Sequence, residues 1–363
     1  MKIYVSGSIA YDEIMDFPHY FKDYFHPEKL HQINVSFAVS DLAKHLGGIA
    51  TNISYSLRLT LNYFENSSSK FNFKEKYSIY PVGAVGKDGD DFLKFFKKND
   101  IDISHAQQDK KLYTATGKVI TDKSDNQIWG FYYGAAKLSP KLKAKSSKKD
   151  GEFWIVAATH EKPFTVVLKH VIKNNLPYLF DPGMTLTWIS DDLLKKGVMN
   201  ASYVIGNDYE IAMIEKRLKV SVKEMVAKGV NIITTLGDKG VKYDGVDVIS
   251  SEVLRIGGQS REISLFKISP LRRDNRDFGR DDKKNSIKIT IPAIKLTKVV
   301  DPTGAGDAWR GGFVGAFVAG RSLEECLVMG NVMASFAVET MGTVEYKVSV
   351  NEIKRRIQSI SKP

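Results

Sequence analysis

Short apolar runs alternate with stretches of helical apolar spacing along the second half of the chain. Strand-like runs at residues 153–157, 178–180, 203–205 and 231–234 are each followed by a turn or by helical spacing. Repeated strand–helix units predict a parallel sheet with helices on both faces. Ligands bind beyond the carboxyl ends of such strands. The residues expected along that edge are Asp181, Asn207, Glu210, Thr235, Gly237 and the loop 301–307.

The N-terminal half predicts a second, smaller sheet. Residues 32–37 alternate between polar and apolar side chains, which is typical of a half-exposed strand. Such a strand fits a small sheet over a site better than the middle of a buried sheet. Residues 115–120 and 127–133 predict an antiparallel hairpin around a polar turn. Buried strands are expected at residues 2–9 and 79–85.

The second arm of the predicted hairpin is crowded with aromatic side chains. Trp129, Phe131, Tyr132 and Tyr133 lie within five residues of one another. They could pack beneath a lid, or they could stack on a flat or ring-shaped ligand. The sequence pattern leaves both alternatives open.

Two polar segments interrupt these patterns. Residues 62–76 include a serine run and predict a loop. Residues 256–289 carry clustered arginine, lysine and aspartate, which indicates an inserted excursion. We interpret it as a solvated loop, with contact to phosphates as the alternative. Helical spacing then predicts helices over 323–340 and 351–360, and the chain reads as a single domain over residues 1–363.

A glycine-rich turn combines the end of a strand with the start of a helix. Val299 and Val300 are expected to end the strand, because Pro302 cannot continue a ladder of hydrogen bonds. The two glycines that follow permit unusual backbone angles and close approach of a ligand. After Asp307 the apolar spacing becomes helical.

The chemistry of this turn depends on the role of Asp307. A helix start presents unpaired N–H groups and the positive end of the helix dipole, which suit a phosphate. A carboxylate there would repel a phosphate, but it could act as the base that takes a proton from an attacking hydroxyl. The alternative is that Asp307 is only a helix N-cap.

Length and composition are those of an ordinary soluble protein. The chain has 363 residues, of which 43% are hydrophobic, and no apolar run approaches the ~20 residues of a membrane span. Strand-like residues begin at Lys2, so no signal peptide is expected. Cys326 is the only cysteine, which excludes an internal disulfide and fits a reducing cytoplasm. Its helical spacing with Leu323 and Leu327 predicts a buried, inert side chain.

The formal net charge of +11 would attract anions, nucleic acid among them. Much of the excess lies in the polar segments 137–149 and 261–288, without interleaved aromatic residues. This distribution favours solvated loops over a nucleic-acid site.

Two motifs resemble the signatures of the ribokinase (PfkB-type) family of sugar and nucleoside kinases. The first is Asp301-Pro302-Thr303-Gly304-Ala305-Gly306-Asp307, and the second, Gly47-Gly48-Ile49-Ala50-Thr51-Asn52, lies far upstream. The resemblance covers nearly the whole chain apart from residues 62–76 and 256–289. It implies a ribokinase-like three-layer α/β/α sandwich with a central, mostly parallel sheet. It also implies a small β lid built from segments 10–46 and 111–134.

The resemblance implies roles for individual residues. Asp307 would be the catalytic base, and the backbone of Gly304, Ala305 and Gly306 would hold the transferred phosphoryl group. A sugar ring would be bound by Asp12, Gly47, Gly48 and Asn52. The nucleotide would be bound by Asn207, Thr235, Gly237, Gly240, Thr303 and Asn331. Asn207 and Glu210 would organise Mg²⁺, mostly through water, although the residues alone favour a loop cap and a surface glutamate.

The chain departs from the commonest ribokinase pattern at Trp309-Arg310 and lacks a lysine after Gly48. These features, together with residues 11–16 and 126–128, resemble the microbial adenosine-kinase-like branch. A Walker-type phosphate loop is absent, so phosphate binding would rest on residues 303–307.

The resemblance implies an ATP- and Mg²⁺-dependent kinase, and it leaves open whether a monovalent cation is required. Phosphorylation of adenosine to AMP is the leading expectation, with ribose, fructose or a sugar phosphate as alternative acceptors. Its partner would be a small molecule rather than nucleic acid or a membrane. A monomer or homodimer in the cytoplasm is expected. A non-catalytic nucleotide or sugar sensor and a nucleic-acid-binding protein are the alternatives from other classes.

Overall fold

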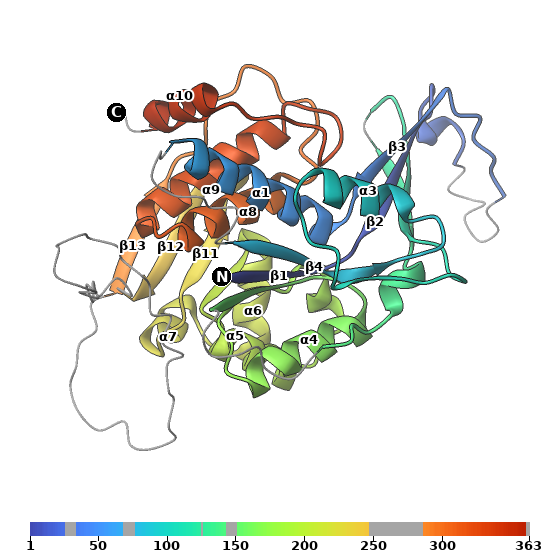
Figure 1. Ribbon diagram of the computed structural model, residues 1–363. Coiled ribbons are helices and arrows are strands. Elements are labelled where there is room, and N and C mark those ends of the chain that lie inside the picture. The colour runs from blue at the N-terminus through green and yellow to red at the C-terminus, as the bar shows by residue number, and fades with distance from the viewer. Residues whose placement is uncertain (26–33, 68–76, 125, 143–150, 247–285, 361–363) are drawn as a thin grey trace.

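Nine strands form the central sheet of the computed structural model, which describes residues 1–25, 34–67, 77–124, 126–142, 151–246 and 286–360 (Figure 1). The strand order is β13-β12-β11-β10-β9-β8-β1-β4-β5. Neighbours are parallel from β11 to β5, and β12 pairs antiparallel with both β11 and the edge strand β13. The strands are β1 (Lys2–Ser6), β4 (Ser78–Val85), β5 (Ala106–Gln108), β8 (Glu152–Ala157), β9 (Tyr178–Asp181), β10 (Tyr203–Asn207), β11 (Ile232–Thr235), β12 (Val241–Val246) and β13 (Ser286–Ile291).

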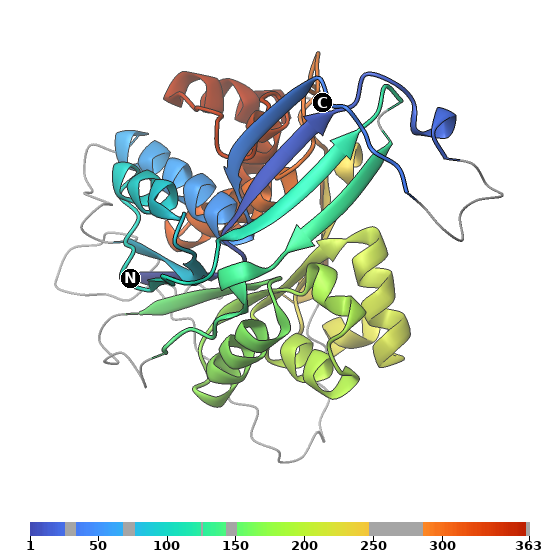
Figure 2. The ribbon, with the colours of Figure 1, turned by 90° about the vertical axis from the view of Figure 1, so that its right-hand side faces the viewer.

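Helices cover both faces of this sheet, as the repeated strand–helix pattern predicted (Figure 2). Successive side chains of β1 point to opposite faces of the sheet: Ile3 and Val5 pack into one apolar core and Tyr4 packs into the other. The first core lies under α1 (Ile49–Ser67), α3 (Asp90–Lys98), α8 (Ala305–Val318), α9 (Leu323–Ala337) and α10 (Val350–Ile360). The second lies under α4 (Glu161–Lys173), α5 (Asp191–Asn200), α6 (Asp208–Leu218) and α7 (Val222–Ala227).

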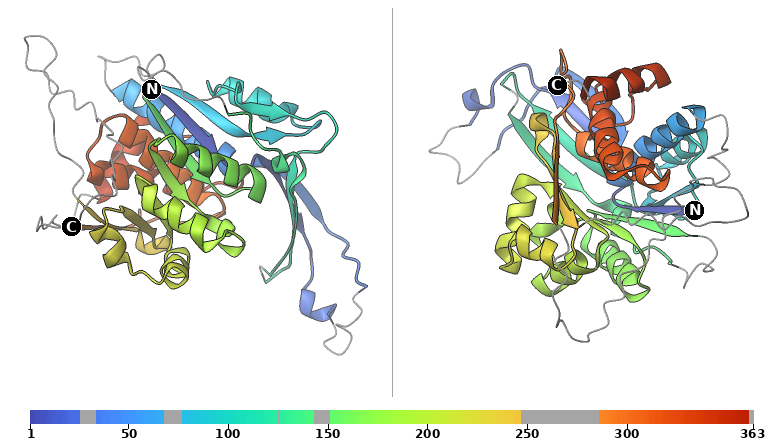
Figure 3. Two further views of the ribbon diagram at one scale, coloured as in Figure 1. Left: turned by 90° about the horizontal axis from the view of Figure 1, so that it is seen from below. Right: turned by 90° about the vertical axis from the view of Figure 1, so that its left-hand side faces the viewer.

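A separate four-stranded sheet, in the order β3-β2-β6-β7, projects from the body of the molecule (Figure 3). β2 pairs antiparallel with β3 and parallel with β6, and β6 and β7 form the predicted antiparallel hairpin. We call this sheet the lid sheet. Its strands are β2 (Ala10–Asp16), β3 (Asp41–Gly47), β6 (Ala115–Thr121) and β7 (Gln127–Tyr132).

Three predictions differ from the structure where residues are described, and residues 256–285 of the polar insert lie outside the described part. Residues 34–37 form no strand, and the lid strand is instead β3, whose pairing with β2 continues to Gly47; residues 32 and 33 lie outside the described residues. Residues 62–67 complete α1 rather than starting a loop, because Phe64 packs into the core; residues 68–76 are outside the described part. Of the polar segment 256–289, the described residues 286–289 belong to β13.

Val299 and Val300 are not in a strand, although their β-branched side chains suggested one. The N–H groups of Val300 and Asp301 donate instead to the carbonyl of Val338, at 2.7 and 3.2 Å. The segment before the glycine loop is therefore held by the end of α9, which stops at Ala337 rather than continuing to residue 340 as predicted.

Small residues bring α8 close to its neighbours. A Cβ on Gly311 would lie 2.5 Å from Cβ of Ser56 in α1, and one on Gly312 would lie 2.6 Å from the carbonyl oxygen of Met329 in α9. The hydroxyl of Ser56 donates to the carbonyl of Ala308 at 2.8 Å. These contacts place the start of α8 against α1 and α9. Among the described residues, no helix is long and apolar enough to cross a membrane.

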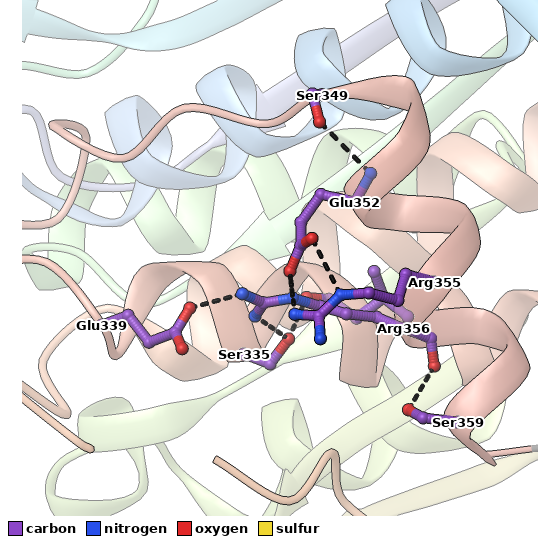
Figure 4. Close-up of polar contacts among 8 residues, drawn as sticks. Ser335, Glu339, Ser349, Glu352, Arg355, Arg356 and Ser359 are labelled. Atoms are coloured by element: carbon purple, nitrogen blue, oxygen red, sulfur yellow. Dashed lines mark hydrogen bonds and ion pairs between the residues drawn. The ribbon is translucent and has the colours of Figure 1, made fainter. Parts of the chain in front are cut away.

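A buried arginine joins α10 to the end of α9 (Figure 4). The guanidinium of Arg356 donates to Ser335 Oγ at 2.7 Å, to Glu339 Oε2 at 2.5 Å and to Glu352 Oε1 at 3.1 Å. It also lies 3.7 Å from the ring centroid of Phe336. The neighbouring Arg355 pairs with Glu352 as well, but its side chain is 74% exposed.

We expect Arg356→Met to lower the free energy of unfolding by about 2–3 kcal/mol, because it leaves the partly buried carboxylate of Glu339 without its partner. Arg355→Met is the matched control and should cost less than about 1 kcal/mol. Urea unfolding followed by circular dichroism measures both. Equal losses for the two variants would contradict a special role for the buried arginine.

Candidate active site

Polar groups gather where the central strands end, as the topology predicted. Asp181 ends β9, Asn207 ends β10 and Thr235 ends β11. The start of α8 joins them, because Arg310 contacts Asp181 across 129 positions of sequence. The glycine loop therefore meets this edge even though no strand leads directly into it.

The loop before α8 is shaped by Asp301. Its Oδ1 accepts the N–H of Thr303 at 2.9 Å, and its Oδ2 accepts the N–H of Gly342 at 3.3 Å. Gly304 then adopts φ +77°, a left-handed conformation that favours glycine. A Cβ there would also lie 2.7 Å from the methyl carbon of Thr343. The sequence thus requires glycine at this position for both conformation and space.

The first turn of α8 leaves backbone donors free. Its N-cap residue, Gly304, offers no side-chain hydrogen bond. Within the described residues, the N–H groups of Gly306 and Asp307 have no hydrogen-bond acceptor, whereas that of Ala308 donates to Gly304. Two free donors at the positive end of a helix dipole form an anion site of the kind that binds phosphate.

Asp307 lies beside these donors. Its Oδ2 accepts a hydrogen bond from Asn52 Nδ2 at 2.8 Å. Burial raises the pKa of the Asp307 carboxyl to about 6, while the charge of Arg310 and the hydrogen bond from Asn52 oppose the rise. A carboxyl with a pKa near 6 is ionised at neutral pH yet basic enough to accept a proton. Asp307 is not itself the N-cap of α8.

Arg310 lies beneath the loop and forms a buried pair with Asp181. Its Nη2 donates to Asp181 Oδ1 at 2.9 Å, and its Nε lies 2.5 Å from Oδ2. Its Nη1 lies 2.6 Å from the position that a Cβ on Gly306 would take. Burial lowers the pKa of the Arg310 guanidinium, but the charges of Asp181, Asp307 and Glu210 outweigh it and raise the pKa, so one cation interacts with three carboxylates.

Asn207 and Glu210 form a capping box at the start of α6. Asn207 Oδ1 accepts the N–H of Glu210, and Glu210 Oε2 accepts the N–H of Asn207, both at 2.8 Å. The cap that the residues alone indicated is therefore present, but Glu210 is partly buried rather than on the surface. Burial raises the pKa of its carboxyl.

The candidate acceptor side lies on the lid sheet. Burial raises the pKa of Asp12 on β2 to about 6, against the opposing effect of His45. Gly47 lies against this carboxylate so closely that a Cβ would overlap Asp12 Oδ2. Gly48 has φ +85°, with the N–H of Ala10 only 2.5 Å from where a Cβ would be. Asp12 also contributes to the raised pKa of Asp307, so the two carboxylates lie close enough to repel one another.

Two lid aromatics lie on the same side of the sheet as Asp12. A Cβ on Gly117 of β6 would lie 3.2 Å from Trp129, 3.5 Å from Phe131 and 3.5 Å from Asp12 Oδ1. Trp129, Phe131 and Tyr132 are 51%, 43% and 45% exposed, so they do not pack beneath the lid. Stacking on a ligand remains a prediction.

The other residues predicted to bind the nucleotide differ in their surroundings and contacts. Thr235 Oγ1 donates to the carbonyl of Gly206 at 3.4 Å, and Gly237 and Gly240 follow it with positive φ. Thr303 is exposed beside the anion site. Asn331 is buried: its Oδ1 accepts from Trp309 Nε1 at 2.8 Å and its Nδ2 donates to the carbonyls of Ile291 and Pro292. In the structure Asn331 joins α8, α9 and the end of β13.

Sequence reasoning missed the roles of Arg310, Asp181 and Thr343 at this site. Arg310 follows Asp307 by three positions, a spacing that places both on one face of a helix and could have indicated the link. Thr343 gave no local signal. Of the residues that the structure describes, no three His, Cys, Asp or Glu side chains form a metal-binding cluster.

The chain matches the pfkB family carbohydrate kinase profile over residues 10–251 and 283–349. It is 28% identical to a nucleoside kinase of Methanocaldococcus jannaschii over 320 residues, which cover 88% of this chain and 87% of that protein. The crystal structure of an M. jannaschii nucleoside kinase has a TM-score of 0.72 at 25% identity, covering 98% of each chain. A Burkholderia thailandensis nucleoside kinase in complex with inosine has a TM-score of 0.71 at 23% identity, covering 98% of this chain and 97% of that one. With the ribokinase-like fold and the profile match in agreement, the chain belongs to the pfkB family of carbohydrate kinases and is a phosphotransferase.

Proposed function

We propose that this protein transfers the γ-phosphate of ATP to the primary hydroxyl of a nucleoside, with adenosine, which would yield AMP, as the leading acceptor. The observation that carries the proposal is the position of Asp307, a carboxylate with a raised pKa beside two free N–H groups at a helix start. Asp307 accepts the proton of the hydroxyl, and the free N–H groups of Gly306 and Asp307 stabilise charge on the transferred group. The N–H of Ala305, expected to take part, donates instead to the carbonyl of Pro302 at 3.3 Å.

The lid sheet supports a nucleoside over a free sugar. Asp12 can accept hydrogen bonds from two neighbouring ring hydroxyls, and Gly47 lies against it. Gly48 and Asn52 are proposed to complete the site for the sugar ring. Trp129 and Phe131 lie on the same side of the sheet, where they can stack on a base. The likeness to nucleoside kinases, one of them in complex with inosine, supports the same acceptor class. Closure of segments 10–46 and 111–134 excludes water from the transfer.

The residues present fit ATP with Mg²⁺. The free donors of α8 suit the γ-phosphate, and Thr235, Gly237, Gly240, Thr303 and Asn331 are proposed for the nucleotide. Glu210 and Asn207 already use one oxygen each in the capping box, so they would hold Mg²⁺ mostly through water. Bound Mg²⁺ neutralises phosphate charge during the transfer.

The test compares ADP release from Mg²⁺-ATP with adenosine, inosine, other nucleosides, ribose, fructose and sugar phosphates as acceptors. We expect kcat/KM for adenosine to exceed that for ribose by at least about a hundredfold, because ribose lacks the base that the aromatics would stack on. A higher kcat/KM for a free sugar would keep the catalytic machinery and overturn the nucleoside assignment.

A further inference from the structure

Thr343 lies at the junction of the two halves of the site, although it is in neither motif. It belongs to the loop between α9 and α10 and is 3% exposed. Its hydroxyl donates to Asn52 Oδ1 at 2.7 Å and lies 3.2 Å from the carbonyl oxygen of Leu46 in β3. Its methyl group packs where Gly304 lacks a side chain. Thr343 thus contacts the lid, the start of α1 and the anion loop at once.

The Asn52 amide is held between the hydroxyl of Thr343 on one side and the carboxylate of Asp307 on the other. An asparagine amide has an accepting oxygen on one side and a donating NH₂ on the other. With its oxygen taken by Thr343, the NH₂ group points at Asp307 Oδ2, 2.8 Å away. The reversed amide would place its oxygen against the Asp307 carboxylate and would give up the short hydrogen bond from the Thr343 hydroxyl to Oδ1. A chain of two hydrogen bonds therefore runs from the Thr343 hydroxyl through Asn52 to the proposed base.

We propose that Thr343 is a positioning residue for phosphoryl transfer, because it orients Asn52 so that the amide holds Asp307 in place as an ionised base. This inference rests on the proposed function, in which Asp307 takes the proton of the acceptor. Thr343 itself touches neither substrate nor the transferred group. Its effect must therefore pass through Asn52.

The orientation also affects when Asp307 is charged. Donation from Asn52 stabilises the carboxylate and lowers its pKa, so loss of that donation raises the pKa. Since catalysis requires the carboxylate, activity falls as pH falls through this pKa, about 6 in the wild type. The other groups that face Asp307 are Arg310 from α8, Asp181 from β9, Asp12 from β2 and Tyr346 from the loop after α9. None of these is changed by a substitution at Thr343.

The experiment replaces Thr343 by valine, which keeps the shape and removes the hydroxyl, and by serine, which keeps the hydroxyl. For Thr343→Val we expect kcat to fall about tenfold, with the KM for ATP nearly unchanged. In the pH profile of kcat/KM, the midpoint of the fall in activity at acidic pH should shift to higher pH by about half a unit. Thr343→Ser should have a kcat within about threefold of the wild type, and the midpoint of its acidic pH dependence should match the wild type. Unchanged kcat and midpoint in Thr343→Val, or no recovery in Thr343→Ser, would overturn the inference.

Two controls separate positioning from a loss of structure. Thr60→Val removes another buried hydroxyl, one that donates within α1 to Ser56, and should leave the pH profile unchanged. In an Asn52→Ala background, adding Thr343→Val should cost less than about twofold more, because the route through Asn52 is already gone. If Thr343→Val lowers kcat as much in the Asn52→Ala background as in the wild type, Thr343 does not act through Asn52. Wild-type activity in Asp307→Asn would contradict the proposed function itself, whatever the Thr343 variants show.

Discussion

Asp307→Asn is expected to lower kcat by about a thousandfold, within the range that a positioned general base contributes. Asparagine has nearly the same shape but cannot accept the proton of the acceptor hydroxyl. The free N–H groups of Gly306 and Asp307 belong to the backbone, so the anion site should survive the change. We therefore expect the Kd for Mg²⁺-ATP to change less than about threefold while turnover is lost.

Steady-state ADP release and calorimetric titration with Mg²⁺-ATP measure the two quantities separately. Asp192→Asn on the exposed start of α5 is the matched control, since it removes a carboxylate far from the loop. Loss of ATP binding by a folded Asp307→Asn protein would show that the side chain serves binding. Retained turnover would exclude Asp307 as the base.

Arg310→Met should be the most destabilising single change at the site, at about 3–5 kcal/mol. It removes the cation that is buried against Asp181 and leaves that carboxylate, only 4% exposed in its side chain, without its partner. Arg310 also lies beneath Gly306, so the loop should lose its support and turnover should fall with stability. Urea unfolding gives the change in free energy.

A double variant distinguishes an unpaired charge from lost packing. Asp181→Leu combined with Arg310→Met replaces both charges by apolar groups and should recover at least about half of the lost stability. The exposed pair of Lys196 with Asp192 supplies the control, because Lys196→Met should cost less than about 1 kcal/mol. If the double variant is less stable than Arg310→Met alone, burial of an unpaired carboxylate is not the cause.

Much of the fold followed from local pattern. The alternating strands and helices after residue 152 specified a parallel sheet, because buried strands and amphipathic helices differ in period. The same pattern placed Asp181, Asn207 and Thr235 at one sheet edge. The glycine string predicted a loop followed by a helix, because glycine permits a tight turn and the apolar spacing after Asp307 is helical. α8 begins slightly earlier than expected, at Ala305.

The errors arose where distant contacts decided the outcome. Val299 and Val300 have strong strand propensity, but the N–H groups of Val300 and Asp301 donate to the carbonyl of Val338 at the end of α9. The lid strand β3 is set by its pairing with β2, which a polar–apolar count over residues 32–37 could not include.

The same limit applies to the site. Asp307 and Gly304 lie within one motif and could be assigned a role from it. Arg310 pairs with Asp181 across 129 positions, and Thr343 bonds to Asn52 across 291. Such partners are defined only when the chain has folded. The three-residue spacing of Arg310 from Asp307 was the one local signal, and no local pattern pointed to Thr343.

The most direct test of the account is to incubate the purified chain with Mg²⁺-ATP, with and without adenosine, and to identify the products by mass spectrometry. The account predicts equimolar ADP and AMP that form only when adenosine is present, and neither product with Asp307→Asn. ATP binding without any phosphorylated acceptor, across adenosine, inosine and ribose, would contradict it and would favour a nucleotide or sugar sensor.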